Sequence, residues 1–555
     1  MPGQNHRYLA ALPRGDGKVF ISWRLLAGDA PDAPFYLERR APGGHWQRVM
    51  DEPIVKATNY LDATSPAGQY SYRVTEPDGA SSEEVSVDST APATVCVVDV
   101  PLPHSAQDTW RLGLGDLDND GRIDYVVPLL VDGEFTLFAY HHDGRLMWNF
   151  PTGLLSDEIS GNSPLSIWDI NADGRTEVVV RRGGKGWAKE LAAVRRGEQV
   201  PRTKAERSPL KQGETLVALD GETGQIVWEV PIEGNSRAVK TATAHVQGVG
   251  KPALVVVQTG TYKDAVTTGY DGLDGRLIWR VTQVRGAGHS VDIADIDGDG
   301  KDEILSGGIC YNGDGTILWE AEPFGHTDIS KPAYIDPSRE GLQVWFAVEG
   351  PPKELNGVYF VDNKGQTIFK EPYRHAHYGW IARHTADVPG LQPHTAEDAR
   401  HEYGAADAGM REEGHFPIFL PDGSHWLNLT EWQRKNLVPV HWDAGPEVVF
   451  IVRKKDKRIV RLLPNGQTEN LCEGTLPAGG RYGRNLGTAD VIGDFRENIV
   501  TVDLERSRLM VLANPTECNV RGYSPYDDLQ YRHDRSQHGS GYHIYLSPPD
   551  TVVNR

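Results

Sequence analysis

The feature that most constrains this chain is a short acidic stretch, Asp295-Ile-Asp297-Gly-Asp299-Gly-Lys-Asp-Glu303. Its alternating aspartates and its closing glutamate bring carboxylates onto one tight loop, where they repel one another unless a hard cation neutralises them. Calcium suits such a loop because it accepts about 6–8 oxygen ligands at flexible angles. β-Branched residues flank the loop, so we expect it to join two β-strands and to bind calcium.

Two other stretches repeat this acidic turn, and an apolar strand follows each of them. Their side chains are Asp116, Asp118, Asp120, Asp124, Asp169, Asn171, Asp173 and Glu177. Weaker copies begin near residues 246, 336, 387, 443 and 490. The eight units recur at intervals of about 50 residues, which indicates a radial or stacked repeat. We therefore predict calcium at the three complete turns and a repeated fold around them.

Each unit also carries a β-hairpin signature, an Asp-Gly or Asn-Gly dipeptide that an aromatic residue often follows. Copies lie at residues 143–144, 220–221, 274–275, 314–315, 422–423 and 465–466. These dipeptides favour the two-residue turns whose twist matches a hairpin, and about four strands per unit are typical of a propeller blade. The sequence therefore predicts an all-β protein with an eight-bladed β-propeller over residues 99–555. Eight hairpins divided between two sandwiches would fit the fixed period less well.

Residues 1–98 lack acidic turns and have a different pattern. Short alternating stretches at residues 19–24, 35–39 and 69–74 predict a small β-sandwich of fibronectin type III character. The composition changes at residues 89–92. We therefore expect two domains, a sandwich over residues 1–98 and the propeller over residues 99–555.

The net charge of −20 argues against binding nucleic acid or an acidic membrane by simple attraction. An anionic substrate remains compatible, because bound calcium reverses the local charge. No apolar run is long enough to enter and span a bilayer, and the first residues lack the apolar segment of a signal peptide. We expect a secreted or periplasmic protein whose signal is absent from this sequence, with cytoplasmic action on oligosaccharides as the alternative. The oligomeric state stays open.

Basic, imidazole and phenolic side chains precede several acidic turns in a similar phase of the repeat. The candidate site residues are His289, His326, Lys331, Arg383, His384, Arg481, Tyr482 and Arg484. Equal phase in a propeller means the same end of the disc, so these residues would line one basin. In the alternative interpretation, each of them only caps the end of a strand.

Calcium, cations and candidate bases in one basin suit an anionic sugar. Elimination across a uronate removes a proton beside a carboxylate, and a calcium ion or an arginine would stabilise the enolate that develops. A neighbouring lysine, tyrosine, arginine or histidine would accept the proton. The sequence shows no close carboxylate pair typical of a glycosidase and no Gly-x-Ser-x-Gly nucleophile motif.

Taken together, these segments resemble polysaccharide lyase family 11, the bacterial rhamnogalacturonan lyases. The resemblance covers nearly the whole chain and is carried by residues 19–26, 58–62, 294–304, 325–328, 335–337, 490–497 and 530–532. It implies an eight-bladed calcium-binding propeller preceded by a fibronectin-like domain. It also implies cleavage of rhamnose-α-1,4-galacturonate bonds by β-elimination.

The resemblance to this family transfers to some site residues and not to others. His289, His326 and Asp328 match family positions. The family's lysine before the last acidic turn is absent from residues 480–485, where Tyr482 stands, and a family histidine is replaced by Lys331. A Gly-Arg-Gly segment of the family is replaced by residues 377–384.

These matches and departures give a mechanistic hypothesis. An arginine or calcium neutralises the uronate carboxylate, Lys331 or Tyr482 removes the proton, and His326 protonates or orients the leaving oxygen. The alternatives are a hydrolase acting on a rhamnose–uronate bond and a glycan-binding propeller without catalytic activity.

Overall fold

The computed structural model shows an all-β protein, as the sequence predicts. The structure describes the chain except residues 1–6, 104–105, 156–164, 185–191, 194, 197–212, 235–237, 323–325, 350–352, 374, 398–414, 453–457, 473–485, 538–544, 551 and 554–555. Short helices in the described part are η2 (Lys353–Leu355), α3 (Glu431–Asn436), η4 (Pro525–Asp527) and α4 (Leu529–Ser536). None of the helices in these ranges is long and apolar enough to cross a membrane.

The N-terminal part forms two small sheets that enclose their own apolar core. One sheet has the order β1-β2-β5, with β1 (Ala10–Gly15), β2 (Lys18–Ser22) and β5 (Asn59–Asp62). The other has the order β4-β3-β6-β7, with β3 (Tyr36–Arg40), β4 (Gln47–Arg48), β6 (Gln69–Thr75) and β7 (Val85–Asp88). Trp23 and Phe35 lie in the core between them, with ring centroids 6.0 Å apart.

Eight antiparallel sheets follow within the described residues. The first four contain β9 (Gly113–Gly115), β10 (Asp124–Val131), β11 (Glu134–Tyr140), β12 (Leu146–Leu154); β13 (Leu165–Trp168), β14 (Glu177–Arg182), β15 (Thr215–Asp220), β16 (Ile226–Pro231); β17 (Val239–Ala244), β18 (Leu254–Thr259), β19 (Ala265–Asp271), β20 (Leu277–Gln283); and β21 (Val291–Ala294), β22 (Glu303–Ser306), β23 (Ile309–Tyr311), β24 (Ile317–Glu320). In each of them, strands adjacent in sequence are also neighbours in the sheet.

The remaining four sheets keep this order with two additions. They contain β25 (His326–Ala333), β26 (Gln343–Glu349), β27 (Gly357–Val361), β28 (Thr367–Pro372); β29 (Ala376–Ala382), β30 (Gln392–Glu397), β31 (Pro417–Phe419), β32 (His425–Asn428) with the parallel β40 (Tyr545–Leu546); β33 (Leu437–Val440), β34 (Val449–Val452), β35 (Ile459–Leu462), β36 (Thr468–Cys472); and β37 (Leu486–Ala489), β38 (Asn498–Asp503), β39 (Arg508–Leu512) with β8 (Cys96–Pro101). Strand β8 therefore joins the start of this region to its last sheet.

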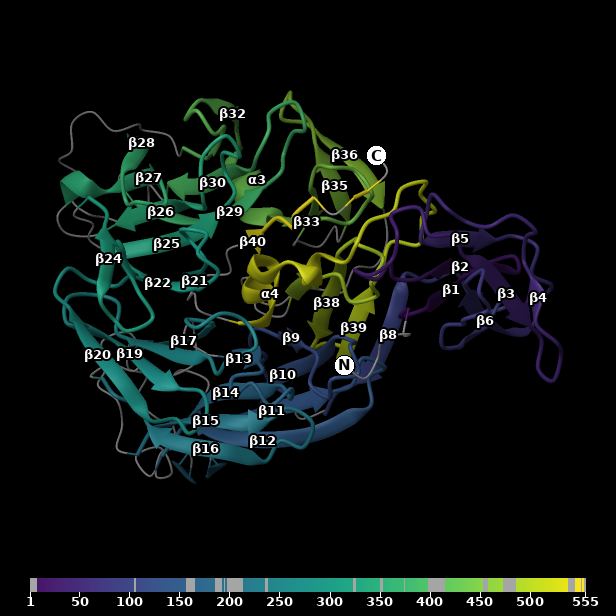
Figure 1. Cartoon of the computed structure of the whole chain (residues 1–555), viewed down its shortest axis with the longest axis horizontal. Helices are drawn as coiled ribbons and strands as arrows, with labels where there is room; N and C mark the ends of the chain where they lie inside the picture. The colour runs from purple at the N-terminus through teal and green to yellow at the C-terminus, as the bar shows by residue number, and fades with distance from the viewer. Residues whose placement is uncertain are drawn as a thin grey trace.

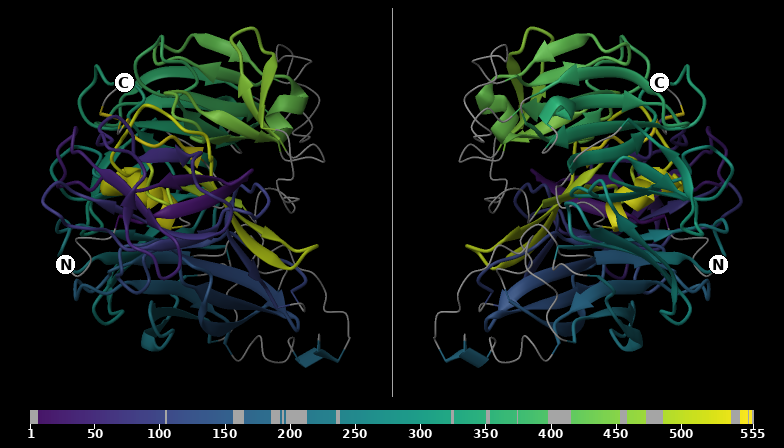
Figure 2. Two further views of the ribbon diagram at one scale, coloured as in Figure 1. Left: turned by 90° about the vertical axis from the view of Figure 1, so that its right-hand side faces the viewer. Right: turned by 90° about the vertical axis from the view of Figure 1, so that its left-hand side faces the viewer.

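The sheets stand around a common centre that holds helix α4 (Figure 1). The first strand of each sheet is called its innermost strand below. Successive innermost strands from β9 to β29 contact one another, and α4 contacts β9, β13, β21 and β37. The N-terminal sheets lie outside the ring beside β8, and the side views show α4 nearer to one face of the ring (Figure 2).

The predicted Asp-Gly and Asn-Gly turns all connect the third and fourth strands of a sheet. Tryptophans on the fourth strands then hold neighbouring sheets together. The indole Nε1 of Trp228 donates a hydrogen bond to the carbonyl of Gly272 at 2.9 Å. Trp148 and Trp279 make the equivalent bonds to Gly221 and Gly313 at 2.7 and 2.9 Å. The aromatic residue after the turn therefore contributes to contacts between sheets.

Glycine is required where these indoles meet the next hairpin. Gly275 has φ +72°, and a Cβ there would lie 2.8 Å from the ring of Trp228. Gly250, in the same sheet, has φ +80° but open space around it. Gly275→Ala should cost about 1–3 kcal/mol of overpacking beyond the backbone strain of roughly 1 kcal/mol that both variants share. Urea unfolding of both variants checks this, and equal losses would contradict it.

The segment after β39 ties the N-terminal sheets to the ring. Arg521 is buried, and its guanidinium donates hydrogen bonds to the carbonyls of Ala33, Ile54 and Ala57 at 2.8, 3.2 and 3.1 Å. On the ring side, Arg122 pairs with Glu83 of the N-terminal part at 3.3 Å. The two parts of the chain therefore share buried polar contacts as well as a linking strand.

Candidate functional site

Innermost strands carry imidazoles at their beginning and acidic turns after their end. His289 precedes β21, whereas Asp295 follows it. His326 is the first residue of β25. The rings of His289 and His326 are 4.5 Å apart and nearly perpendicular. The innermost strands thus hold the histidines and the acidic turns at opposite ends of the ring.

A group of imidazoles and carboxylates, all buried except one half-buried histidine, meets at the beginning of β21, β25 and β29. We call this group the histidine cluster; its residues are His289, His326, Asp328, Glu349, His375 and His377. The donor atoms of Asp328, Glu349, His375 and His377 lie within 4.8 Å of one another. The same holds for the donor atoms of His289, His326 and Asp328. The cluster therefore has the composition and the spacing of a cation site.

Asp328 is at the centre of the cluster. Its Oδ2 lies 2.6 Å from Nδ1 of His377, and its Oδ1 lies 3.4 and 3.7 Å from Nε2 of His326 and His289. Pairing between β25 and β26 shifts register between Thr327 and Ile329, so Asp328 is the extra residue of a β-bulge. A bulge redirects a side chain that regular pairing would place elsewhere, and bulges are common beside active sites.

Glu349 extends the cluster through strand pairing. It is the β26 partner of His326, and its Oε1 lies 3.5 Å from His326 Nε2. Its Oε2 lies 2.6 Å from Nδ1 of His375. No local motif marked Glu349 in the sequence, because only the pairing of β25 with β26 brings it to the histidines.

Burial and mutual charge set the ionisation of the cluster. Burial lowers the pKa of His289 well below its ordinary value, and the neighbouring His326 lowers it further. Burial alone would lower the pKa of His326, but the facing Asp328 and Glu349 carboxylates raise it above its ordinary value. Burial would raise the pKa of Asp328, but the imidazoles of His377 and His326 hold it well below its usual range. Asp328 is therefore an anion. His289 is a neutral imidazole, and its unprotonated ring nitrogen can accept a hydrogen bond or ligate a cation.

The geometry of the histidine cluster fits a bound cation. Asp328 Oδ1 and His326 Nε2 are buried, and neither forms a hydrogen bond with any described residue. Buried polar atoms are normally bonded. An anionic oxygen and imidazole nitrogens aimed at one point fit a divalent cation.

Two more residues at this end of the ring were not predicted from the sequence. Lys240, in β17, is buried, and its positive charge contributes to lowering the pKa of His289. The ring of Tyr262 stacks on His326 with centroids 4.5 Å apart. Lys240 occupies the same position in its repeat as His289 does, so the repeat pattern could have identified it. Tyr262 follows the second strand of its sheet, and no sequence pattern marks it.

Lys331 lies in a different environment from the one expected. Its Nζ is 3.3 Å from Asp292 Oδ1 and 2.5 Å from Asp534 Oδ1 of helix α4. These carboxylates outweigh the effect of burial and raise the pKa of Lys331. It lies five residues beyond His326 on β25, roughly 15 Å along an extended strand. An ammonium held between two buried carboxylates fits a structural role better than that of a base.

Lys331→Ala should therefore destabilise the protein. It would leave Asp292 and Asp534 buried without this counter-charge, and breaking a buried ion pair costs about 3–5 kcal/mol. Urea unfolding measures the loss. Lys370→Ala is a control, because Lys370 forms an exposed pair with Glu322 at 3.0 Å that should contribute about 0–1 kcal/mol. A catalytic lysine would instead lose turnover while stability stayed near the wild-type value.

The other expected site residues do not join the cluster. His384 follows the far end of β29, stacks on Phe450 at 5.7 Å and accepts a hydrogen bond from Trp380 at 3.0 Å. Burial lowers its pKa to about 3. Arg383 lies next to it and approaches Asp550 at 3.8 Å. The expectation that both share a basin with His326 is not met, because β29 runs through the ring between them. Arg481, Tyr482 and Arg484 lie outside the described residues.

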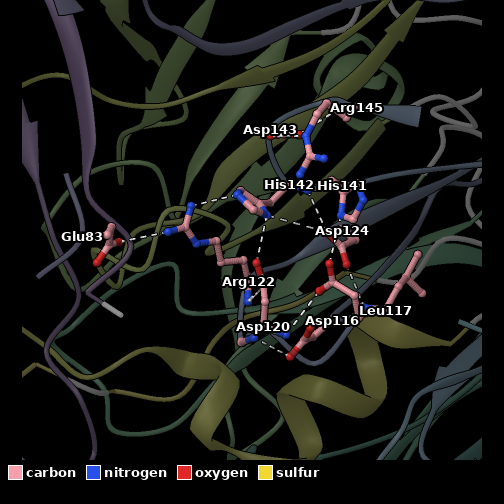
Figure 3. A network of polar contacts seen from close by, with 12 residues as sticks. Glu83, Asp116, Leu117, Asp120, Arg122, Asp124, His141, His142, Asp143 and Arg145 are labelled. Atoms are coloured by element: carbon pink, nitrogen blue, oxygen red, sulfur yellow. Dashed lines mark hydrogen bonds and ion pairs between the residues drawn. The ribbon is translucent and has the colours of Figure 1, made fainter. Parts of the chain in front are cut away.

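The acidic turn before β10 has the geometry of a cation loop (Figure 3). Gly121 N–H donates to Asp116 Oδ2 at 2.8 Å, while buried Asp116 Oδ1 has no hydrogen-bond partner within the described ranges. Burial and neighbouring carboxylates raise the pKa of Asp116 to about 7 and of Asp124 to about 8. His141 and His142 reach into the turn, with Nδ1 of His141 2.9 Å from Asp118.

The turns after β13 and β21 repeat this arrangement. Gly174 and Gly300 donate to Asp169 and Asp295 at 3.0 and 2.9 Å. Their closing glutamates, Glu177 and Glu303, are buried; burial first, and then the turn aspartates, raise the pKa of each to about 8. Asp169 Oδ1 is another buried oxygen without a hydrogen-bond partner in the described chain. Raised carboxylate pKa values at all three turns, and an unbonded aspartate oxygen at the first two, fit a hard cation at these turns. The remaining predicted ligands are Asp120 in the turn before β10, and Asn171, Asp173, Asp297 and Asp299 in the turns after β13 and β21.

These features define a class of protein, an all-β repeat protein with acidic turns at one end of its innermost strands and a polar site at the other. A family model described as rhamnogalacturonan lyase family 11, C-terminal domain, matches residues 105–405. The match covers more than half of the 555 residues. The chain belongs to rhamnogalacturonan lyase family 11.

Curated relatives and solved structures agree with this assignment. The chain is 28% identical over 376 residues to the rhamnogalacturonan exolyase YesX of Bacillus subtilis (strain 168), an alignment that covers 59% of each protein and so less than two thirds of that relative. It is 24% identical over 595 aligned positions to the endolyase YesW of the same organism, covering 95% of this chain and 88% of YesW. The fold is similar to the crystal structure of YesX, with a TM-score of 0.76 and 20% identity over 99% of this chain and 96% of the other. A Bacillus licheniformis lyase structure gives 0.74 and 22% with the same coverage.

Proposed function

We propose that this chain is a rhamnogalacturonan lyase that cleaves rhamnose-α-1,4-uronate bonds of pectic polysaccharide by β-elimination at the histidine cluster. The observation that carries the proposal is the convergence of the buried His289, His326 and Asp328 with the half-buried His377 in a chain of this lyase family. The substrate is an anionic polysaccharide or oligosaccharide. We also propose that the protein acts outside the cytoplasm.

The finer description of the fold belongs to the same proposal. Eight sheets with the same strand order around one centre, the last completed by β8, support an eight-bladed β-propeller over residues 99–555. Two facing sheets around Trp23 support a fibronectin type III-like sandwich over residues 1–98. Strand β8 starts at Cys96, so the linker precedes it.

Cations complete the proposed enzyme. The three acidic turns would bind calcium through aspartate and glutamate oxygens. In the histidine cluster, Asp328, Glu349 and the imidazoles would hold a divalent cation. Bound there, it would neutralise the uronate carboxylate and so acidify the adjacent C–H bond.

The protein's own side chains supply the remaining steps. Elimination removes the proton at the carbon beside the carboxylate, forms a carbon–carbon double bond and breaks the bond to the glycosidic oxygen, which takes up a proton. Lys240 adds positive charge beside His289 and favours an anionic substrate. The stacked Tyr262 fixes the ring plane of His326, so that its Nε2 would ligate the cation, and the leaving oxygen would take its proton from water. Tyr482 remains the proposed base.

Ultraviolet absorbance of the unsaturated product tests the reaction directly. Digestion of rhamnogalacturonan should raise the absorbance as chain ends appear. Release of saturated rhamnose-ended products without absorbance would replace the lyase with a hydrolase. Binding of the polysaccharide with neither product would indicate a glycan-binding protein.

A further inference from the structure

A second group of metal-ligating side chains lies away from the innermost strands. Glu371 is near the end of β28, His415 precedes β31, and His425 opens β32. We call these residues the rim triad, because β28 and β32 are the fourth strands of neighbouring sheets. Their donor atoms lie within 4.8 Å of one another.

The rim triad is a converged arrangement. Nε2 of His415 is 2.7 Å from Glu371 Oε1, and Nε2 of His425 is 3.0 Å from Oε2. Both imidazoles thus present the same nitrogen to one carboxylate, and their ring centroids are 5.2 Å apart. The three side chains come from separate stretches of the chain, so the packing of two sheets produces this convergence.

Aromatic neighbours fix the two imidazole rings. His415 lies edge-on to Tyr373 with centroids 5.5 Å apart, and His425 lies edge-on to Phe419 at 4.9 Å. The exposed fractions of the His415, Glu371 and His425 side chains are 8, 15 and 33%. The triad is therefore held from below by rings and opens to solvent at His425.

The Glu371 carboxylate is the anionic member of the triad. Burial raises the pKa of Glu371, but the hydrogen bonds from His415 and His425 outweigh this effect and lower it to about 2. The adjacent Lys370 points to Glu322 instead, at 3.0 Å. The triad is thus an anionic oxygen between two imidazoles.

We propose that the rim triad binds a divalent transition metal such as Zn2+, which clips the sheet of β28 to the sheet of β32. Two imidazole nitrogens and one carboxylate favour zinc, cobalt or nickel over calcium, which prefers oxygen ligands. Ligands about 2.0 Å from zinc in a tetrahedral site lie roughly 3.3 Å apart, so outward shifts of a few tenths of an ångström admit the ion. Water completes the fourth position on the open side.

The metal replaces the protons that now join the two imidazoles to Glu371. Such a site would contribute stability and not chemistry, since it lies on a different part of the sheets from the histidine cluster. The proposal does not depend on the lyase activity. It predicts a metal that survives loss of the histidine cluster.

Titration calorimetry with Zn2+, and visible absorbance with Co2+, test the proposal on the full chain with excess Ca2+ to occupy the acidic turns. The Glu371→Gln/His425→Ala double variant should bind one ion fewer per chain than wild type. Zn2+ at about 100 times its dissociation constant should raise the Tm of wild type, because that occupancy stabilises a one-site protein by about 2.7 kcal/mol. The double variant should lose the part of this increment that the rim triad contributes, whereas any Zn2+ at the histidine cluster adds equally to both proteins.

His45→Ala is the matched control, because it removes an exposed histidine of the N-terminal sheets. It should leave both the stoichiometry and the Tm increment unchanged. The single variant His425→Ala removes a partly exposed ligand and carries the test if the double variant folds poorly. Equal stoichiometry in wild type and in the folded variants overturns the proposal, whatever the activity of the protein.

Discussion

Asp328→Asn should reduce turnover of rhamnogalacturonan by about 10²-fold or more, as loss of a group that holds or orients catalytic machinery does. The reason lies in its position, with both carboxylate oxygens facing imidazoles at the bulge of β25. The neutral amide removes the anion that raises the pKa of His326 and that would bind the cation. The rate of absorbance increase measures turnover, and calorimetry measures cation binding on the same samples.

Asp314→Asn provides the control, because Asp314 is an exposed aspartate of the β23–β24 hairpin. It should keep full activity and cation binding. His326→Gln should reproduce the loss in Asp328→Asn if the cluster acts as one unit. Wild-type turnover in a folded Asp328→Asn variant would place the active site elsewhere.

Sequence patterns predicted the all-β class and the acidic turns because their chemistry is local. A turn such as residues 295–303 contains its own ligands, and each Asp-Gly hairpin specifies its own geometry. The pattern also placed His289 and His326 at the same end of the ring, where the structure brings them together, since both lie at the beginning of an innermost strand. His377, the third imidazole on Asp328, begins β29 in the same way. Phase was therefore a real signal for this end of the ring.

Position in the repeat misplaced Lys331 and His384, because a few residues along an extended strand span much of the depth of the ring. Lys331 shares β25 with His326 but meets Asp534 of helix α4, which the sequence did not place. His384 follows the other end of β29 from His377 and packs among aromatic rings. Glu349 belongs to the histidine cluster only because β26 pairs it with His326. Contacts set by strand pairing or by a distant helix leave no local pattern.

Removing calcium should lower the Tm, by an amount on the order of 5–10 °C at pH 8 and by much less at pH 5. The pKa values of Asp124, Glu177 and Glu303 are raised to about 8 by burial and neighbouring carboxylates, whereas the unfolded chain has ordinary values near 4. The folded, metal-free protein therefore binds more protons than the unfolded chain between about pH 4 and 8. Its stability should fall as pH rises through this window.

Calcium replaces those protons, so its stabilising effect should grow with pH over the same range. Differential scanning calorimetry with and without a chelator at both pH values measures the effect. Asp124→Asn should reduce the increment at pH 8, because it removes one of the carboxylate charges that calcium would neutralise. The Asp124 carboxylate also accepts hydrogen bonds from the N–H groups of Leu117 and His142. Asp78→Asn, in an exposed turn of the N-terminal sheets, should leave it unchanged. A Tm that is insensitive to chelation at pH 8 would show that the acidic turns hold their carboxylates together without calcium.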